Sequence, residues 1–268
     1  MKRAIVTLAI GDAYRQNFDL LCRKGWSAYA ERHGYDLVVI KEPLDVSERA
    51  RKRSLAWQKC LVLGAPDVAQ YEQVVWIDSD IYINPAAPSV MEGVPLERVG
   101  VVDDHRLPTP EIRQGIIKKM IANAPERGGL DKRYWQAWLD PGTWHAYVGL
   151  PGGQRHMVQT GVMVMSPKHH RAAFDHVYHS YEDSGAASLH YEARPLSHEI
   201  QAQNLAHWID PRFNALVWWL VELKTLTSGR GPTQTELHHF LLDSYQRYHF
   251  LHFAGVGHLM PLIGSIGA

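Results

Sequence analysis

The chain has 268 residues, of which 46% are apolar and 21% are charged. A chain of this length and composition can bury a sizeable core, and we expect one domain spanning residues 1–268. Its 28 Lys and Arg balance its 28 Asp and Glu, so the formal net charge is zero. That balance argues against a protein that mainly binds nucleic-acid phosphates, although the 16 His add positive charge at acid pH.

The first apolar run, Ala4–Ile10, follows Lys2-Arg3 and superficially resembles a signal peptide. Gly11-Asp12 ends the run before any small-residue cleavage pattern, and no stretch approaches the roughly 20 apolar residues of a membrane span. We therefore expect a soluble, cytoplasmic protein with no transmembrane segment, and peripheral contact with a membrane stays open. Cys22 and Cys60 could form one disulfide, but two reduced thiols are the favoured interpretation.

The first half of the chain alternates strand-like and helix-like segments. Short apolar runs predict buried strands, and spacings of three and four predict helices. The expected strands are Ala4–Ile10, Asp36–Ile40 and Val74–Ile77, and the expected helices are Tyr14–His33, capped by Gly34, and Leu55–Leu63. This order favours an α/β fold with a mostly parallel sheet and flanking helices, whose ligands lie at the carboxyl ends of the strands.

The second half is less regular. We expect strands at Val99–Val102 and Gly161–Met165, helices at Thr109–Ile121, His170–Tyr181 and Ser197–Trp208, and an irregular aromatic stretch at Trp135–Tyr147. No linker marks a boundary, so one domain in two halves, about 1–105 and about 106–268, is predicted.

The segment Asp78-Ser79-Asp80 directly follows the third expected strand. Side chains at i and i+2 of an extended segment share a face, so Asp78 and Asp80 should project together. Two adjacent carboxylates repel unless a cation neutralises them, and hard oxygen ligands favour magnesium, manganese or calcium. The alternative is a polar strand end whose aspartate caps the next turn.

Residues 75–83, VWIDSDIYI, resemble the aspartate-x-aspartate segment of GT-A glycosyltransferases. Four further segments follow in the order of that superfamily. Residues 7–14 resemble its first-strand loop, and residues 29–37 resemble its YAxxHGYD stretch. Residues 159–164 resemble its N-[ST]-G-V strand, with Gln159 in place of Asn, and residues 252–255 resemble the HFxG segment of glycogenin-like retaining enzymes. The resemblance covers nearly the whole chain and implies a GT-A, Rossmann-like fold.

The resemblance also implies roles for individual residues. The implied metal ligands are Asp78, Asp80 and His252, holding Mn²⁺ or Mg²⁺. The implied nucleotide-sugar contacts are Thr7, Leu8, Ala9, Tyr14, Arg53, Lys59, Asp78, Ser79 and His258, the last replacing a lysine of the family pattern. Residues near the reacting sugar would be Gln159, Glu199 and Gln201. Solvated charges on a helix face explain Arg53 and Lys59 equally well, and a helix N-cap arrangement explains Glu199 nearly as well.

The function implied is metal-dependent transfer of a hexose from a nucleotide diphosphate sugar, UDP-linked, to a glycan or other hydroxyl acceptor, with retention. Two alternatives stay open. One is a metal-dependent phosphoesterase or nucleotidyl hydrolase, for which Asp103-Asp104-His105 could supply further ligands. The other is a non-catalytic, sugar-binding GT-A shell. The aromatic residues of 135–147 could stack on sugars or form core, and Pro211–Asn214 is expected to be structural or part of an acceptor wall.

Overall fold

A computed structural model describes residues 1–123, 132–183 and 191–264 of the chain. Over these ranges the central sheet has six strands in the order β2-β1-β3-β6-β5-β7. They are β1 (Arg3–Leu8), β2 (Asp36–Ile40), β3 (Gln73–Ile77), β5 (Val99–Asp103), β6 (Val158–Met165) and β7 (Ala206–Trp208). Strand β6 runs antiparallel to both neighbours and the remaining pairs are parallel, which confirms the predicted mostly parallel sheet.

A second sheet joins distant parts of the chain. Its three strands, in the order β4-β9-β8, are β4 (Ile81–Ile83), β9 (Phe250–His252) and β8 (Ala215–Leu216) within the described residues. In the antiparallel pairing of β4 with β9, Ile81 lies opposite His252. The hydrogen bonds between β4 and β9 thus hold the C-terminal region next to the segment that follows β3.

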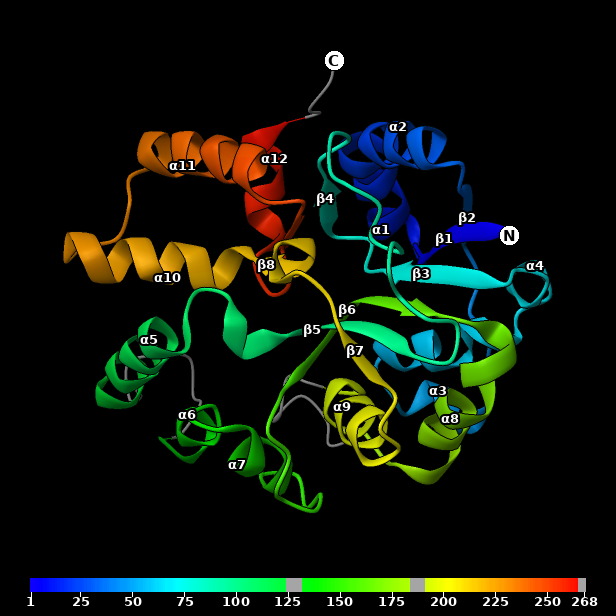
Figure 1. Ribbon diagram of the computed structural model, residues 1–268. Helices are drawn as coiled ribbons and strands as arrows, with labels where there is room; N and C mark the ends of the chain where they lie inside the picture. The colour runs from blue at the N-terminus through cyan, green and yellow to red at the C-terminus, as the bar shows by residue number, and fades with distance from the viewer. Residues whose placement is uncertain (124–131, 184–190, 265–268) are drawn as a thin grey trace.

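Helices cover the sheet and form a separate group beside it (Figure 1). The N-terminal helical segment contains α1 (Asp12–Asn17), a π-helical turn (Phe18–Cys22) and α2 (Arg23–His33), and it ends at Gly34 with φ 66°, the left-handed cap that the sequence predicts. The other α-helices are α3 (Glu48–Arg51), α4 (Pro66–Ala69), α5 (Pro110–Ala122), α6 (Lys132–Ala137), α7 (Pro141–Ala146), α8 (Pro167–Ser180), α9 (Ala193–Ala202), α10 (Val217–Ser228), α11 (Gln234–Arg247) and α12 (Met260–Ile263). Within the described residues the 3₁₀ helices are Leu55–Gly64, Asp104–Arg106, Pro211–Asn214 and Gly257–Leu259.

Alternate residues of the central strands fill two cores. In β1, Ile5 packs into one core, whereas Ala4 and Val6 pack into the other. Successive side chains of a strand point to opposite faces of the sheet. A strand buried on both faces therefore has apolar residues at consecutive positions of its sequence. A third core, formed mostly by the aromatic stretch together with α5 and α10, includes Trp135, Trp138, Trp144 and Trp219.

Three expected elements differ from the structure. Asp36–Ile40 was expected to be buried, but β2 lies at the sheet edge and its side chains are half-buried or exposed. The expected helix Ser197–Trp208 begins one turn earlier, at Ala193, and ends at Ala202, because residues 206–208 pair with β5 as an edge strand. The stretch Trp135–Tyr147, expected to be irregular, contains the end of α6 and all of α7. No helix in the described ranges combines the length and apolar character needed to cross a membrane.

Candidate active site

A cleft of about 550 Å³ opens where β1 and β3 end. It is lined by residues from six stretches of chain: 8–14, 54–59, 76–80, 159–160, 191–193 and 252–255. The polar lining includes Asp78, Asp80 and His252 together with Lys59 and Glu192. This is the strand edge at which a parallel α/β sheet binds its ligands.

The three residues expected as metal ligands lie together in this cleft. One ligand atom from each of Asp78, Asp80 and His252 lies within 4.8 Å of the others, and no other such group of three occurs in the described residues. His252 Nε2 is 3.3 Å from Asp80 Oδ1 and 3.7 Å from Asp78 Oδ2. Adjacent ligands of an octahedral ion at about 2.1 Å are roughly 3 Å apart, so small side-chain movements suffice to close the site on an ion.

Main-chain hydrogen bonds hold the two halves of this cluster together. Phe253 N donates to Asp80 O over 3.0 Å, and Asp78 N donates to Gly161 O over 2.9 Å. The aspartates therefore sit in a turn between β3 and β4 whose backbone is bound on both sides. Their convergence comes from these bonds and not from an extended Asp-x-Asp segment, since Ser79 and Asp80 form the turn itself.

Asn214 determines which nitrogen of His252 faces the aspartates. Its Nδ2 donates to Gln159 O over 3.5 Å, so its Oδ1 is directed at His252 Nδ1, 2.8 Å away. The amide oxygen can only accept, which assigns the proton to Nδ1 and leaves the Nε2 lone pair toward Asp78 and Asp80. This arrangement fits a metal-ligating histidine. Pro211–Asn214 therefore has a positioning role that the sequence did not reveal.

Gly161 leaves the space that His252 occupies. A Cβ at this position would lie 2.4 Å from His252 Cε1 and 2.6 Å from Nδ1. Only glycine allows strand β6 to approach the buried imidazole this closely. Gly161 belongs to the motif of residues 159–164, but the sequence alone does not contain this steric reason for it.

Lys59 links two carboxylates at the back of the cleft. Its Nζ lies 2.9 Å from Asp78 Oδ1 and 2.9 Å from Glu192 Oε1. Burial disfavours the ammonium, but the two carboxylates outweigh it and raise the pKa of Lys59. Trp76 Nε1 also donates to Asp78 Oδ1 over 2.8 Å, so Asp78 is held from two sides before any ligand binds.

Glu192 is the site residue that the sequence analysis missed. It is buried, it lines the cleft, and it accepts a hydrogen bond from Thr160 Oγ1 over 3.2 Å. It directly precedes α9, which begins at Ala193. Pro195 could have indicated this start, because proline is favoured in the first turn of a helix.

Glu199 and Gln201, expected near the reacting sugar, do not line the cleft. Glu199 accepts from Tyr181 Oη and from Gln203 Nε2, and Gln201 Nε2 donates to His156 O over 2.9 Å. They lie six and eight positions after Ala193, the residue of α9 that lines the cleft, and so about two turns further along the helix. Gln159, the third expected residue, does line it.

The expected nucleotide contacts divide similarly. Leu8, Tyr14, Lys59, Asp78 and Ser79 line the cleft. The remaining four, which lie outside its lining, are Thr7, Ala9, Arg53 and His258. Thr7 and Ala9 are buried within the first strand and its loop, and His258 is exposed on a 3₁₀ helix. The Arg53 guanidinium instead donates to Tyr178 O over 2.6 Å and stacks on Trp57, 4.4 Å from the ring centre.

Asp103-Asp104-His105 does not extend the metal cluster. Asp104 pairs with Arg113 over 2.6 Å, and Asp103 binds His156 Nδ1 over 2.7 Å. Burial, assisted by Arg113, lowers the pKa of His105. These residues are therefore not part of the candidate metal site, and the further ligands that a phosphoesterase would need are engaged elsewhere.

No family model and no curated protein sequence matches the chain. Among solved structures it is similar to a glycosyltransferase involved in the glycosylation of the major capsid of PBCV-1, with 14% identity, 97% of this chain and 100% of that chain covered, and a TM-score of 0.54. It is also similar to galactosyltransferase LgtC in complex with donor and acceptor sugar analogs (12% identity, 93% and 86% covered, TM-score 0.48) and to mouse xyloside xylosyltransferase 1 (13%, 94% and 97%, 0.42). The first similarity confirms the predicted GT-A fold.

Proposed function

We propose that this protein is a metal-dependent glycosyltransferase that moves a hexose from a UDP-sugar to a hydroxyl of a glycan or other acceptor, with retention. The observation that carries the proposal is the Asp78–Asp80–His252 cluster in the cleft of a GT-A fold. The sequence resemblance and the fold similarity are two separate lines of support for it. Retention rests on the resemblance of residues 29–37 and 252–255 to retaining enzymes.

The donor set favours Mn²⁺ over Mg²⁺. Two carboxylates suit either ion, but Mg²⁺ strongly prefers oxygen, and the third donor here is the His252 imidazole. Asp78, Asp80 and His252 would hold the ion. When bound, it supplies a Lewis acid that neutralises negative charge on the departing diphosphate.

The rest of the cleft offers contacts for the nucleoside and the sugar. Tyr14, 61% exposed at the cleft, presents a ring against which a nucleobase can pack. Lys59 and Glu192 offer a donor and an acceptor that are already fixed by their own ion pair. We assign them to the hydroxyl groups of the donor sugar, which they can bind without further side-chain ordering. The free thiols of Cys22 and Cys60 suit a reducing compartment and support a cytoplasmic location.

The test is the release of UDP and the formation of a glycoside from a panel of UDP-hexoses, with Mn²⁺ or with EDTA. We expect transfer only with the metal and its loss in Asp80→Asn, with the anomeric configuration of the product followed by NMR. Asp243→Asn is the matched control, since Asp243 is paired with Arg247 on α11, outside the cleft lining. Cleavage of a phosphate bond without transfer would identify a phosphoesterase, and binding without release a non-catalytic shell.

A further inference from the structure

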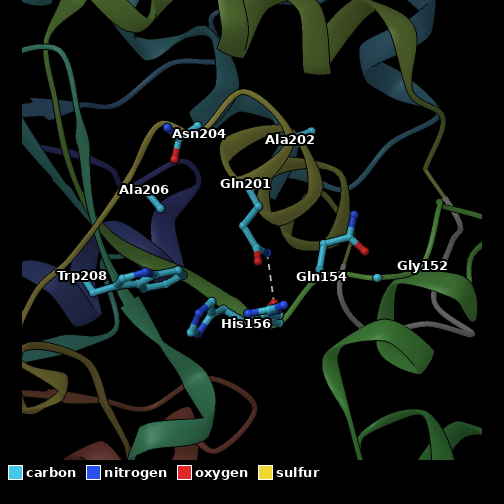
Figure 2. A pocket seen from close by; sticks show the side chains of 10 residues that line it. Gly152, Gln154, His156, Gln201, Ala202, Asn204, Ala206 and Trp208 are labelled. Atoms are coloured by element: carbon cyan, nitrogen blue, oxygen red, sulfur yellow. Dashed lines mark hydrogen bonds between the residues drawn. The ribbon is translucent and has the colours of Figure 1, made fainter.

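A second pocket, of about 470 Å³, lies at the other end of α9 (Figure 2). It is lined by the loop 152–156, the C-terminal end of α9 and the edge strand β7, and it shares no residue with the cleft. Ala193 lines the cleft and Gln201, eight positions further along α9, lines this pocket, so about 12 Å of helix separates them. Its volume falls within the roughly 300–1,000 Å³ of small-molecule sites.

The pocket combines hydrogen-bond acceptors that lack donors with donors that lack acceptors. Gln154 Oε1 has no hydrogen-bond partner among the described residues but is itself shielded from solvent, and its Nε2 lies 2.6 Å from His198 Nδ1. Gln201 uses Nε2 for His156 O and Ser197 O, and its Oε1 has no hydrogen-bond partner among the described residues. On the donor side, Arg155 forms no ion pair with any residue in the described ranges.

One wall of the pocket is aromatic. The half-exposed indole of Trp208 packs against the His156 ring with centroids 4.4 Å apart. Asp103 accepts from His156 Nδ1 over 2.7 Å, which fixes the ring and leaves Nε2 without a partner among the described residues. In Figure 2 the Gln201 side chain extends from α9, with Trp208 on one side and Gln154 on the other.

This mixture of groups identifies the class of ligand. A fully ionised phosphate only accepts hydrogen bonds and would meet the amide oxygen of Gln201 unfavourably. An ammonium group only donates and would be repelled by Arg155. A hydroxyl both donates and accepts, and a pyranose adds C–H groups that can pack on an indole. The described residues supply no third metal ligand beside Asp103 and His156, so an ion is not indicated.

We propose that this pocket is a carbohydrate-binding site, separate from the transfer cleft, that holds a pyranose residue of a glycan. Trp208 provides the stacking surface, and Arg155, Gln201 and Asn204 bind the hydroxyl groups. Its use in capturing an acceptor glycan rests on the proposed function. Binding of the sugar itself needs neither metal nor donor, because the pocket lies outside the cleft.

The experiment is saturation-transfer difference NMR with methyl glycosides of glucose, galactose, mannose and N-acetylglucosamine as probes, at millimolar concentration with EDTA and no nucleotide. We expect at least one glycoside to give a signal, lost in Trp208→Leu and weakened about tenfold or more in Asn204→Gly. Glycine suits the φ of 52° at residue 204, so this second variant removes the amide without straining the backbone. Gln203→Ala, whose side chain binds Glu199 outside the pocket, should keep the signal.

Two results would overturn the inference: no signal from any of the four glycosides, or equal signals from the parent, Trp208→Leu and Asn204→Gly. The failures of the two proposals can be told apart. A protein that binds a glycoside here yet never transfers sugar refutes the proposed function alone. A transferase whose pocket variants bind glycosides as the parent does refutes the second site alone.

Discussion

Replacing Gly161 by alanine tests how strand β6 shapes the metal site. The added Cβ would lie 2.4 Å from His252 Cε1, well inside the carbon–carbon contact distance of about 3.5–4.0 Å. The imidazole is buried and bound to Asn214 over 2.8 Å, so it cannot move without losing that bond or shifting β6. We expect Gly161→Ala to disturb the direction in which Nε2 points.

The magnitude follows from these contacts. Overpacking of a buried site costs about 1–3 kcal/mol of unfolding free energy. Loss of the partner that orients a ligating histidine weakens metal binding about 10–100-fold, which corresponds to about 1.4–2.7 kcal/mol. We therefore expect Gly161→Ala to unfold at lower urea concentration and to bind Mn²⁺ at least tenfold more weakly in calorimetric titrations.

The matched control is Gly231→Ala. A Cβ at Gly231 meets no atom within 4 Å, so both the stability and the Mn²⁺ affinity should equal those of the parent. If Gly161→Ala binds Mn²⁺ as tightly as the parent, His252 is not a metal ligand and the assignment of the site is refuted. A lower stability of Gly161→Ala without a change in Mn²⁺ affinity would not support the metal site, because overpacking of any buried strand lowers the stability.

Three further predictions concern the surroundings of the site. Asn214→Leu should keep the fold but weaken Mn²⁺ binding about 10–100-fold, and equal calorimetric affinity would contradict the role of Asn214. Lys59→Met should lower the free energy of unfolding in urea by about 3–5 kcal/mol, because Asp78 and Glu192 lose their shared cation; an unchanged midpoint would contradict this. Burial lowers the pKa of His145 from 6.5 to about 4. The unfolded chain therefore binds a proton first as pH falls, and the stability should decrease between about pH 6.5 and 4 by about 3 kcal/mol, a pH slope that His145→Gln should flatten.

Much of the fold could be predicted from local sequence. The apolar runs at 74–77 and 99–102 are strands, and Gly34 ends α2 in the left-handed conformation. These features depend on the conformational preferences and periodicity of neighbouring residues, which a sequence displays directly. The position of Asp78 and Asp80 after β3 followed from the same local reasoning.

The local sequence does not distinguish functional from structural residues when both lie in similar sequence patterns. Glu192 and Glu199 are both acidic residues near the start of a helical pattern, and only the packing of α9 against β6 shows that Glu192 reaches the cleft. Arg53 and Lys59 lie six residues apart with equal claims to a nucleotide. The fold directs Lys59 to Asp78 and turns Arg53 toward the backbone of Tyr178.

The sequence by itself determined the alternation of strands and helices, the acidic turn after β3 and the candidacy of His252. Only the tertiary structure decided that Asp80, Gly161 and His252 meet, since sheet pairing joins segments more than 80 residues apart. Asn214 and Glu192 acquire their roles in the same way. A hydrogen bond or an ion pair depends on distance in space, and for these residues that distance is set by the packing of strands and helices, which the local pattern around each residue does not contain.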